Sequence, residues 1–400
     1  MGSIQDLPNE LLLQVMEHCG SDLLQLVKAY PTALSCFSEN RKSFVARMSN
    51  RFRNSLDFSS FLRPARLRYI RQERNFSFPK IFLIEDKISQ VLKSTRHTTP
   101  PELHKFSLSA LCSMSGLGED AKLIIDEYSK QALANMAKNP GADFYVTRQS
   151  KELTQDERRR FMTAAITFES YCLTFFNRQQ LLHERGDEFR QMFFKRYGRG
   201  MRRKNAVGRF YCIMFYILQK HRELLSNVAK HLESIHGRVL PSLTDGPQQY
   251  LEKSFLNSMQ EDYETRFFNH LHYLTSQGLG MLARLQKMSI EELTGFVLTT
   301  YLDSREFNYP AVSITMEIRD FPLGTQEDYR PWLPWIYLDD ILEDAYNYET
   351  GGYEIWEDTW SRAIPFWDPS EDECPYIEHP YSRFFVNQSP VQFWFLYRAD

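Results

Sequence analysis

The histidines come closest to a set of side chains that could bind a metal ion. His221, His231 and His236 lie in one stretch, and His270 and His272 lie in another. Imidazole nitrogens bind zinc together with cysteine or carboxylate partners at short, fixed spacings. No Cys-x-x-Cys pair and no His-Glu-x-x-His sequence accompanies these histidines. We therefore expect surface or core histidines, no metal site and no cofactor.

Two pairs of carboxylates could in principle bind a sugar or a metal ion. Asp339-Asp340 and Glu343-Asp344 are expected on a helical segment among aromatic residues. An acidic, solvated face explains the same residues without any chemistry, and we prefer that interpretation. We predict no catalytic residue. An enzyme in the C-terminal half stays open as the remote alternative.

Two basic stretches could contact a phosphate or an acidic partner. From Arg41 to Arg74 about ten basic residues face about two acidic ones, and Tyr197 to Lys204 carries several more. The net charge of −3 and the pI near 6.4 provide no overall attraction to nucleic acid. We expect a solvated linker with a short helix, an exposed loop and no nucleic-acid partner. Within the linker, the residues expected to pack inward are Leu62, Leu67 and Ile70.

Composition predicts an intracellular protein, cytoplasmic or nuclear or both. Hydrophobic residues make up 42% of the 400 residues, which is ample for a core. The six cysteines form no regular pattern and are expected to be reduced thiols. The N-terminal residues lack the features of a signal peptide. The densest apolar run, from Phe210 to Leu218, is about half a membrane span, so we expect no membrane partner.

Most of the chain reads as helix, because apolar residues recur at three- and four-residue steps. The expected helices are 81–92, 102–114, 119–137, 154–183, 206–236, 247–274 and 296–302. Ser115 to Gly118 is expected to form a turn between the second and third of these helices. Thr154 with Glu157 and Ser289 with Glu292 predict capping boxes, in which a hydroxyl and a carboxylate each accept a backbone N–H.

The C-terminal quarter differs from the helical body in composition. All six tryptophans lie between Trp332 and Trp394, and acidic residues far outnumber arginines from Asp320 onward. Large aromatic side chains supply the apolar area that disordered tails lack. We therefore predict that this segment packs on the helical body.

The N-terminal stretch carries more apolar surface than it can bury by itself. On a helix, Leu7, Leu11 and Val15, with Leu12, Met16 and Cys19, cover about half of the circumference, which is wider than one core-facing stripe. Gly20 is expected to end this helix, and Leu23, Leu24, Leu26 and Val27 give the next helix a similarly broad arc. Short helices of this kind need a partner, which is either the rest of the chain or another protein.

The same residues resemble the F-box, the motif that binds the small Skp-type adaptor of cullin–RING ubiquitin ligases. The similarity is carried by Leu7-Pro8-x-Glu10-Leu11-Leu12-x-x-Val15-Met16 and Asp22-Leu23-Leu24-x-Leu26. The continuation through Tyr30-Pro31, Leu34 and Phe37 is similar to a variant common in fungal F-box proteins. Leu153-Thr-x-x-Glu157 and Gly351-Gly-Tyr-x-x-Trp356 are similar to elements of the helical body and tail of such proteins.

The resemblance implies a mainly α protein with four parts. These are a three-helix F-box at 1–48, a basic linker and short helix at 49–78, an irregular multi-helical body at 79–303, and an aromatic, acidic C-terminal segment at 304–400. It also implies a substrate receptor of an SCF-type ligase, which binds the adaptor and through it cullin, and which recruits an unknown target protein. The residues expected to meet the adaptor or to support that surface are Leu7, Pro8, Leu11, Leu12, Val15, Met16, Leu23, Leu24 and Val27.

One further alternative stays open at this point. The F-box could pack internally and bind no adaptor, which would make the chain a structural or regulatory interaction protein.

Overall fold

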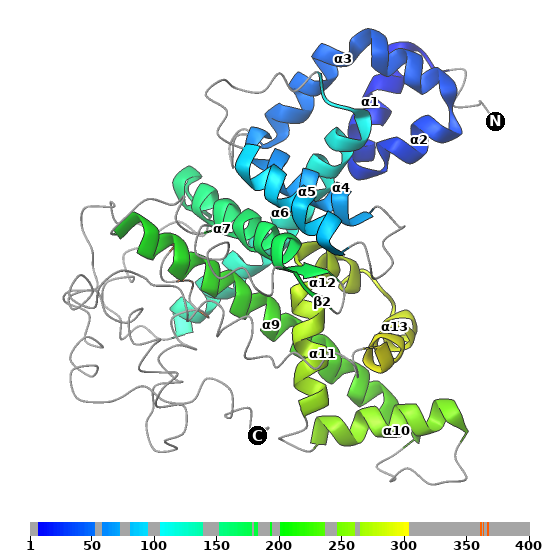
Figure 1. The fold of residues 1–400 in the computed structure, drawn as a ribbon, viewed down its shortest axis with the longest axis vertical. Coiled ribbons are helices and arrows are strands. Elements are labelled where there is room, and N and C mark those ends of the chain that lie inside the picture. Colours follow the sequence, from blue (N-terminus) through cyan, green and yellow to red (C-terminus); the bar gives the residue numbers. More distant parts are fainter. Residues whose placement is uncertain are drawn as a thin grey trace. The chain divides into compact units, whose positions relative to one another are not determined.

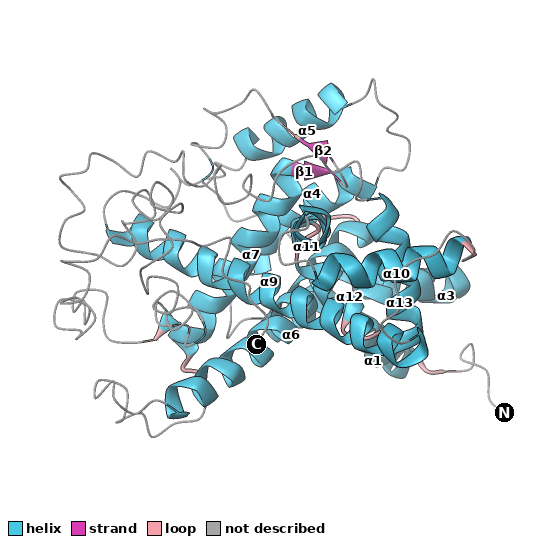
Figure 2. Cartoon of the chain, turned by 90° about the horizontal axis from the view of Figure 1, so that it is seen from below, coloured by secondary structure: helices cyan, strands magenta, loops and turns pink. Residues whose placement is uncertain are grey.

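The fold is mainly helical. A computed structural model describes residues 7–52, 58–72, 81–94, 105–138, 152–177, 180–182, 193, 201–236, 246–260, 265–303, 361, 363 and 366–367. These residues form twelve α-helices and two strands of two residues each, β1 (Phe176–Asn177) and β2 (Gln180–Leu181) (Figure 2). The predicted mainly α class is therefore confirmed.

The chain divides into two compact units, each described here by itself. Unit 1 comprises Met1–Glu127 and Glu152–Asn177, and unit 2 comprises Tyr128–Lys151 and Arg178–Asp400. The boundary between them falls inside one helix, α6 (Leu108–Lys138). The boundaries predicted at 48, 78 and 303 follow composition and motif rather than contacts, and they stay predictions.

Unit 1 contains the N-terminal helices and two helices that follow later in the chain. Its elements are α1 (Asn9–Cys19), η2 (Gly20–Asp22), α2 (Leu23–Ala29), α3 (Pro31–Phe52), η3 (Phe58–Phe61), α4 (Leu62–Gln72), α5 (Ile81–Ser94), the first part of α6, and α7 (Gln155–Phe175) (Figure 1). Helix α1 packs on α2 and α3, and α4 packs on α5 and α7. Leu62, Leu67 and Ile70 of α4 are buried, as the sequence predicted.

Helix α7 begins at the predicted capping box. Thr154 Oγ1 accepts the backbone N–H of Glu157 at 3.2 Å, and Glu157 Oε2 accepts that of Thr154 at 2.8 Å. Its residues from Ala164 to Phe175 are all buried. A helix buried on every side occupies the middle of its surroundings, which is why α7 can contact groups from several other helices.

The turn expected at Ser115 to Gly118 is wrong, because α6 runs through these residues without a break. Leu111, Met114, Leu117, Ala121 and Ile125 continue one buried stripe across both glycines. A glycine inside a helix costs about 1 kcal/mol relative to alanine. A continuous buried stripe outweighs that local cost.

Unit 2 is arranged around one long helix, α9 (Met201–His236). It packs against α10 (Pro247–Gln260), α11 (Thr265–Ser276), α12 (Leu279–Leu285) and α13 (Ile290–Asp303) (Figure 1). The single helix predicted at 247–274 is described as two, α10 and α11. Helix α13 begins at the predicted capping box, where Ser289 N–H donates to Glu292 Oε2 at 3.0 Å and Glu292 N–H donates to Ser289 Oγ at 3.3 Å.

Four residues of the C-terminal segment are described, and they belong to unit 2. Ala363, Phe366 and Trp367 are buried. The Phe366 ring meets Tyr128 of α6 edge-on at 6.2 Å, and the carbonyl of Ser361 accepts a hydrogen bond from Asn135 Nδ2 at 3.2 Å. The predicted packing of the rest of 304–400 lies outside the described residues.

No helix in the described ranges has both the length and the apolar composition that a membrane crossing requires.

Candidate functional site

The nine residues expected to meet a partner lie on α1 and α2 or directly before α1. Pro8 precedes α1 with φ −53°, and its carbonyl accepts the N–H of Leu12 at 2.9 Å. Gly20 ends α1 with φ +51°, a conformation that favours glycine. Helix α3 starts at Pro31 immediately after α2, so a proline that ends one helix here begins the next. The three helices lie together (blue in Figure 1).

Four of these nine residues are buried within the chain. Leu12, Met16, Leu23 and Val27 are between 0% and 8% exposed. They share this core with residues of α3, whose Phe37 and Phe44 rings meet edge-on at 5.4 Å. These four side chains support the surface from inside and are not available to another protein.

Three others lie elsewhere, and we call them the outward stripe: Leu11 and Val15 on α1, and Leu7 directly before it. The four-residue spacing of Leu11 and Val15 places them on one side of the helix, and the buried Leu12, Leu13 and Met16 occupy the other. Leu11 is 45% exposed, and Leu7 and Val15 are half-buried. Of the remaining two residues, Pro8 is exposed and Leu24 is half-buried.

Two contacts fix the direction of α1 on α3. The Cys36 thiol donates to the Asn9 carbonyl at 3.7 Å near the start of both helices, and Arg47 Nε pairs with Glu17 Oε1 at 2.7 Å further along. The two helices therefore run in the same direction. Leu34, near the start of α3, is 48% exposed and adds a second uncovered apolar side chain to this part of unit 1.

The corner between α1 and α2 is pressed against α6. A Cβ atom on Gly20 would meet the carboxylate of Glu119, which would have to move, and the φ of +51° already favours glycine at this corner. Burial raises the pKa of the Cys112 thiol on α6 to about 11, and a hydrogen bond with the backbone of Leu24 partly opposes this shift. Arg41 of α3 lies over the Phe37 ring at 5.6 Å and donates to the carbonyl of Phe106 just before α6. The N-terminal helices are thus part of unit 1.

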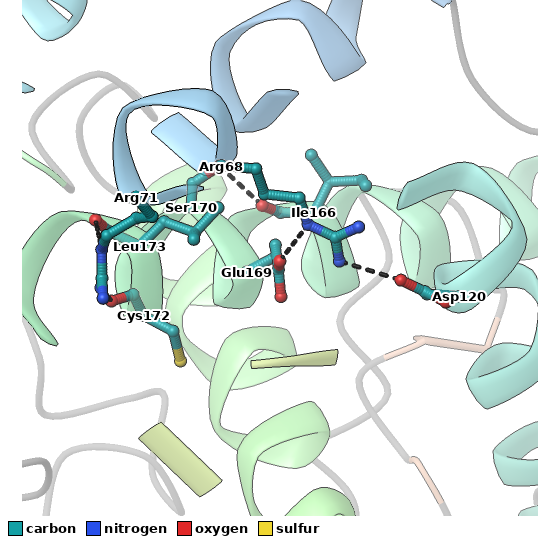
Figure 3. A network of polar contacts seen from close by, with 8 residues as sticks. All are labelled: Arg68, Arg71, Asp120, Ile166, Glu169, Ser170, Cys172 and Leu173. Carbon is teal, nitrogen blue, oxygen red and sulfur yellow. Dashed lines mark hydrogen bonds and ion pairs between the residues drawn. The ribbon is translucent and has the colours of Figure 1, made fainter. Parts of the chain in front are cut away.

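A second polar group in unit 1 was not anticipated from the sequence. Arg68 of α4 pairs with Glu169 of α7 at 2.6 Å and with Asp120 of α6 at 3.0 Å (Figure 3). Arg71 donates to the carbonyls of Cys172 at 2.8 Å and Leu173 at 3.2 Å, at the end of α7. We call these two arginines with their partners the arginine network.

The arginine network keeps its charges although it is buried. Burial by itself would lower the pKa of Arg68, but the carboxylates of Glu169 and Asp120 more than offset this, and the pKa is raised. Burial lowers the pKa of Arg71 to about 10, which leaves it charged at neutral pH. Carbonyls at a helix C-terminus attract a cation. The network ties α4 to α6 and α7.

The histidines expected to be core or surface residues occupy both kinds of position in unit 2. His221, His270 and His272 are buried, and burial lowers each of their pKa values to about 3. His236 is partly exposed and pairs with Glu252 of α10 at 2.6 Å. Among the residues that the structure describes, no group of three or more His, Cys, Asp or Glu side chains could hold a metal ion.

The other candidate sites lie outside the described part of the chain. These are the acidic pairs at 339–340 and 343–344 and the side chains of the basic stretch at 197–204. The sequence pattern singled out the N-terminal helices as a place of excess apolar surface, and in the structure Leu11 and Leu34 of these helices are exposed. It could not separate the inward residues from the outward stripe, because both fall within one broad apolar arc.

No protein-family model, curated protein or solved structure matches this chain.

Proposed function

We propose that this chain is a substrate receptor of an SCF-type ubiquitin ligase. Its N-terminal F-box-like helices would bind a Skp-type adaptor and, through it, cullin. The target protein would bind elsewhere, on the helical body or its aromatic tail. The chain would supply binding surfaces and no chemistry of its own.

The observation that carries this proposal is the outward stripe. Helix α1 has apolar residues on two sides, and within the described part of the chain those on one side are fully buried while those on the other are not. Leu11 keeps 45% of its surface exposed between two half-buried neighbours, Leu7 and Val15. An apolar stripe on a helix of this amphipathic type is a common way for one protein to bind a groove of another.

The stripe offers apolar surface that a partner would bury, most of it on Leu11. Burying an apolar side chain of this size contributes about 1.5–3 kcal/mol, and a few such anchors carry most of the affinity in many interfaces. The inward residues Leu12, Met16, Leu23 and Val27 would hold α1 and α2 in place before the partner arrives. A surface that is already ordered loses less conformational freedom on binding.

The test is a triple substitution of the stripe, Leu7→Ala with Leu11→Ala and Val15→Ala, in the full chain. Binding of a purified Skp-type adaptor should weaken by at least about 100-fold, because three anchors are lost. The matched control is Leu83→Ala on α5, which removes a side chain that is 55% exposed in the same unit. If the triple variant bound the adaptor as well as the wild type and its thermal melt were unchanged, the outward stripe would not be the adaptor-binding surface.

A second candidate function is favoured by the inward residues. If the N-terminal helices serve only to complete unit 1, the chain is a structural or regulatory interaction protein that binds no adaptor. Burial of Leu12, Met16, Leu23 and Val27 and the contact between Gly20 and Glu119 favour this alternative.

Pull-down of the wild-type chain with purified adaptor separates the two candidates. Specific adaptor binding that the triple variant loses supports the receptor. No binding by a folded wild-type chain supports the structural role.

A further inference from the structure

Two buried histidines connect three helices of unit 2 through hydrogen bonds to threonine hydroxyls. His221 Nδ1 of α9 lies 3.3 Å from Thr275 Oγ1 of α11. His270 Nε2 of α11 lies 3.0 Å from Thr300 Oγ1 of α13. We call His221 and His270 the histidine pair. Both side chains are 0% exposed.

Each threonine hydroxyl of the histidine pair also lies within hydrogen-bond distance of a backbone carbonyl. Thr275 Oγ1 donates its hydrogen to the Leu271 carbonyl at 2.9 Å, and Thr300 Oγ1 donates to the Phe296 carbonyl at the same distance. A hydroxyl has only one hydrogen, so a threonine that donates to its carbonyl accepts from the imidazole. This arrangement favours the tautomers with the proton on Nδ1 of His221 and on Nε2 of His270.

The other nitrogen of each ring is left as a bare acceptor in the interior. His221 Nε2 and His270 Nδ1 are fully buried and have no hydrogen-bond partner among the described residues. A proton added at either position would place a charged N–H where no acceptor meets it. Such a group loses the hydration that stabilises a charge in water.

The titratable groups on the neighbouring helices do not compensate for such a charge. On α10, Glu252 is paired with His236, and on α9, Lys220 is paired with Glu223. On α12, Arg284 lies over the Phe296 ring, and on α13, the Tyr301 ring meets His270 edge-on at 5.7 Å. Among the described residues, only His270 shifts the pKa of His221 besides burial, and burial alone lowers the pKa of His270.

We propose that the histidine pair is an acid-sensitive lock that holds α11 to α9 and α13. While both rings are neutral, their hydrogen bonds join the three helices. When the solution becomes acidic, protonation favours states in which α11 has separated and both imidazoles reach water. His272, also buried on α11, acts in the same direction.

The protonation states determine whether acid favours opening or closing, and over which pH range. In an opened state each histidine has an ordinary pKa near 6.5, and in the closed state it has a pKa of about 3. The opened state binds more protons between these values, so the lock is complete above pH 6.5 and weakens as the pH falls toward 3. From pH 7 to pH 5 the opening equilibrium constant should rise about 25-fold for each histidine, and several hundredfold for the pair.

The test is hydrogen exchange of the full chain between pH 7 and pH 5, with rates corrected for intrinsic exchange. Protection of the α11 amides should fall by about 10⁴-fold in the wild type, since His221, His270 and His272 each contribute about 25-fold, and protection of α7 in unit 1 should change far less. In a His221→Gln, His270→Gln double variant the fall should shrink to that left by His272. The matched control, His18→Gln with His231→Gln, removes two less buried histidines and should leave the wild-type fall unchanged.

Single variants keep the test decisive if the double variant does not fold at pH 7. His221→Gln and His270→Gln should each reduce the loss of protection by about 25-fold. A wild-type protection that stays flat to pH 5 would overturn the proposal. A fall that the single variants do not reduce would also overturn it.

Discussion

Unit 1 and unit 2 each bury nitrogen-containing side chains where several helices meet, but in different charge states. Arg68 and Arg71 are charged and are held by carboxylates and carbonyls. His221 and His270 are neutral and are held by threonine hydroxyls. Guanidinium cannot lose its proton near neutral pH, so its burial needs fixed acceptors. Imidazole can lose its proton, so its burial needs a hydrogen-bond partner for one nitrogen and a pH at which the ring is neutral.

This difference determines what each group is sensitive to. The arginine network depends on the presence of its partners, because removing one leaves a buried charge without compensation. The histidine pair depends on the proton concentration, because its neutral form already fits the interior. We therefore expect unit 1 to respond strongly to substitution and weakly to mild acid, and the histidine pair to show the opposite pattern.

Among single substitutions, Glu169→Ala is expected to lower the free energy of unfolding the most. The Glu169 side chain is 2% exposed and that of Arg68 is 16% exposed, so the guanidinium would stay buried with one carboxylate fewer. Breaking a buried ion pair from one side costs about 3–5 kcal/mol of unfolding free energy. Urea unfolding followed by circular dichroism measures this loss.

Glu169→Gln is the control for that substitution. It keeps an acceptor oxygen and the side-chain volume, so it should cost clearly less than Glu169→Ala. Equal stability of Glu169→Ala and the wild type would show that the network contributes little to unit 1.

The arginine network could not have been predicted from the sequence, because its partners are far apart in the chain. Arg68 and Glu169 are 101 residues apart, and Arg68 and Asp120 are 52 apart. The sequence placed Arg68 in a basic stretch that looked solvated. Only tertiary packing determines which arginines of such a stretch are buried.

Contacts between residues close in the sequence could be predicted, because they do not depend on how distant helices pack. The capping boxes at Thr154 and Ser289 involve residues three positions apart, and both form as predicted. The turn expected at Ser115 to Gly118 was wrong because two glycines were given more weight than the apolar stripe on both sides of them. The outward stripe needed the structure, because an apolar arc of half a helix does not show which part faces the core.

The next largest effect is that of His270→Leu, which should lower the free energy of unfolding at pH 7 and raise it at pH 5 relative to the wild type. His270→Leu removes one neutral hydrogen bond, and it should cost about 1 kcal/mol at pH 7. At pH 5 the wild type loses about 2 kcal/mol from this histidine, because the unfolded state is protonated and the folded state, with a pKa of about 3, is not. The variant lacks that loss and should become the more stable protein.

Urea unfolding at pH 7 and pH 5 measures whether the order of stability of the wild type and the variant reverses, which we call the crossing. Replacing His231, which is less buried, by Leu serves as the control and should show no crossing. A variant that is less stable than the wild type by the same amount at pH 7 and pH 5 would contradict the assignment of a buried, neutral His270.

A smaller effect is expected at the start of the helix that carries Glu169. Thr154→Ala removes the hydroxyl that accepts the Glu157 N–H, and loss of such a cap costs about 1 kcal/mol. Thr154→Ser keeps the acceptor and should cost only a fraction of that value. Thermal melts of Thr154→Ala, Thr154→Ser and Glu169→Ala would compare the stability contributed by a local cap with that contributed by a long-range contact on the same helix. A loss equal to that of Glu169→Ala would mean that α7 is held mainly by its end.

The smallest effect is expected from a second arginine–carboxylate pair of unit 1, which has the same chemistry but more exposure. Arg158 Nη1 of α7 lies 3.2 Å from Asp126 Oδ1 of α6, and the two side chains are 32% and 35% exposed. Water screens both charges there and solvates either one when the other is removed, so Asp126→Ala should cost less than about 1 kcal/mol. Raising the salt concentration should reduce even this difference, because exposed charges are screened more than buried ones. If urea unfolding showed that Asp126→Ala costs as much as Glu169→Ala, burial would not be what makes the arginine network sensitive to its partners. The contrast between the two units would then have to rest on the identity of the side chains alone.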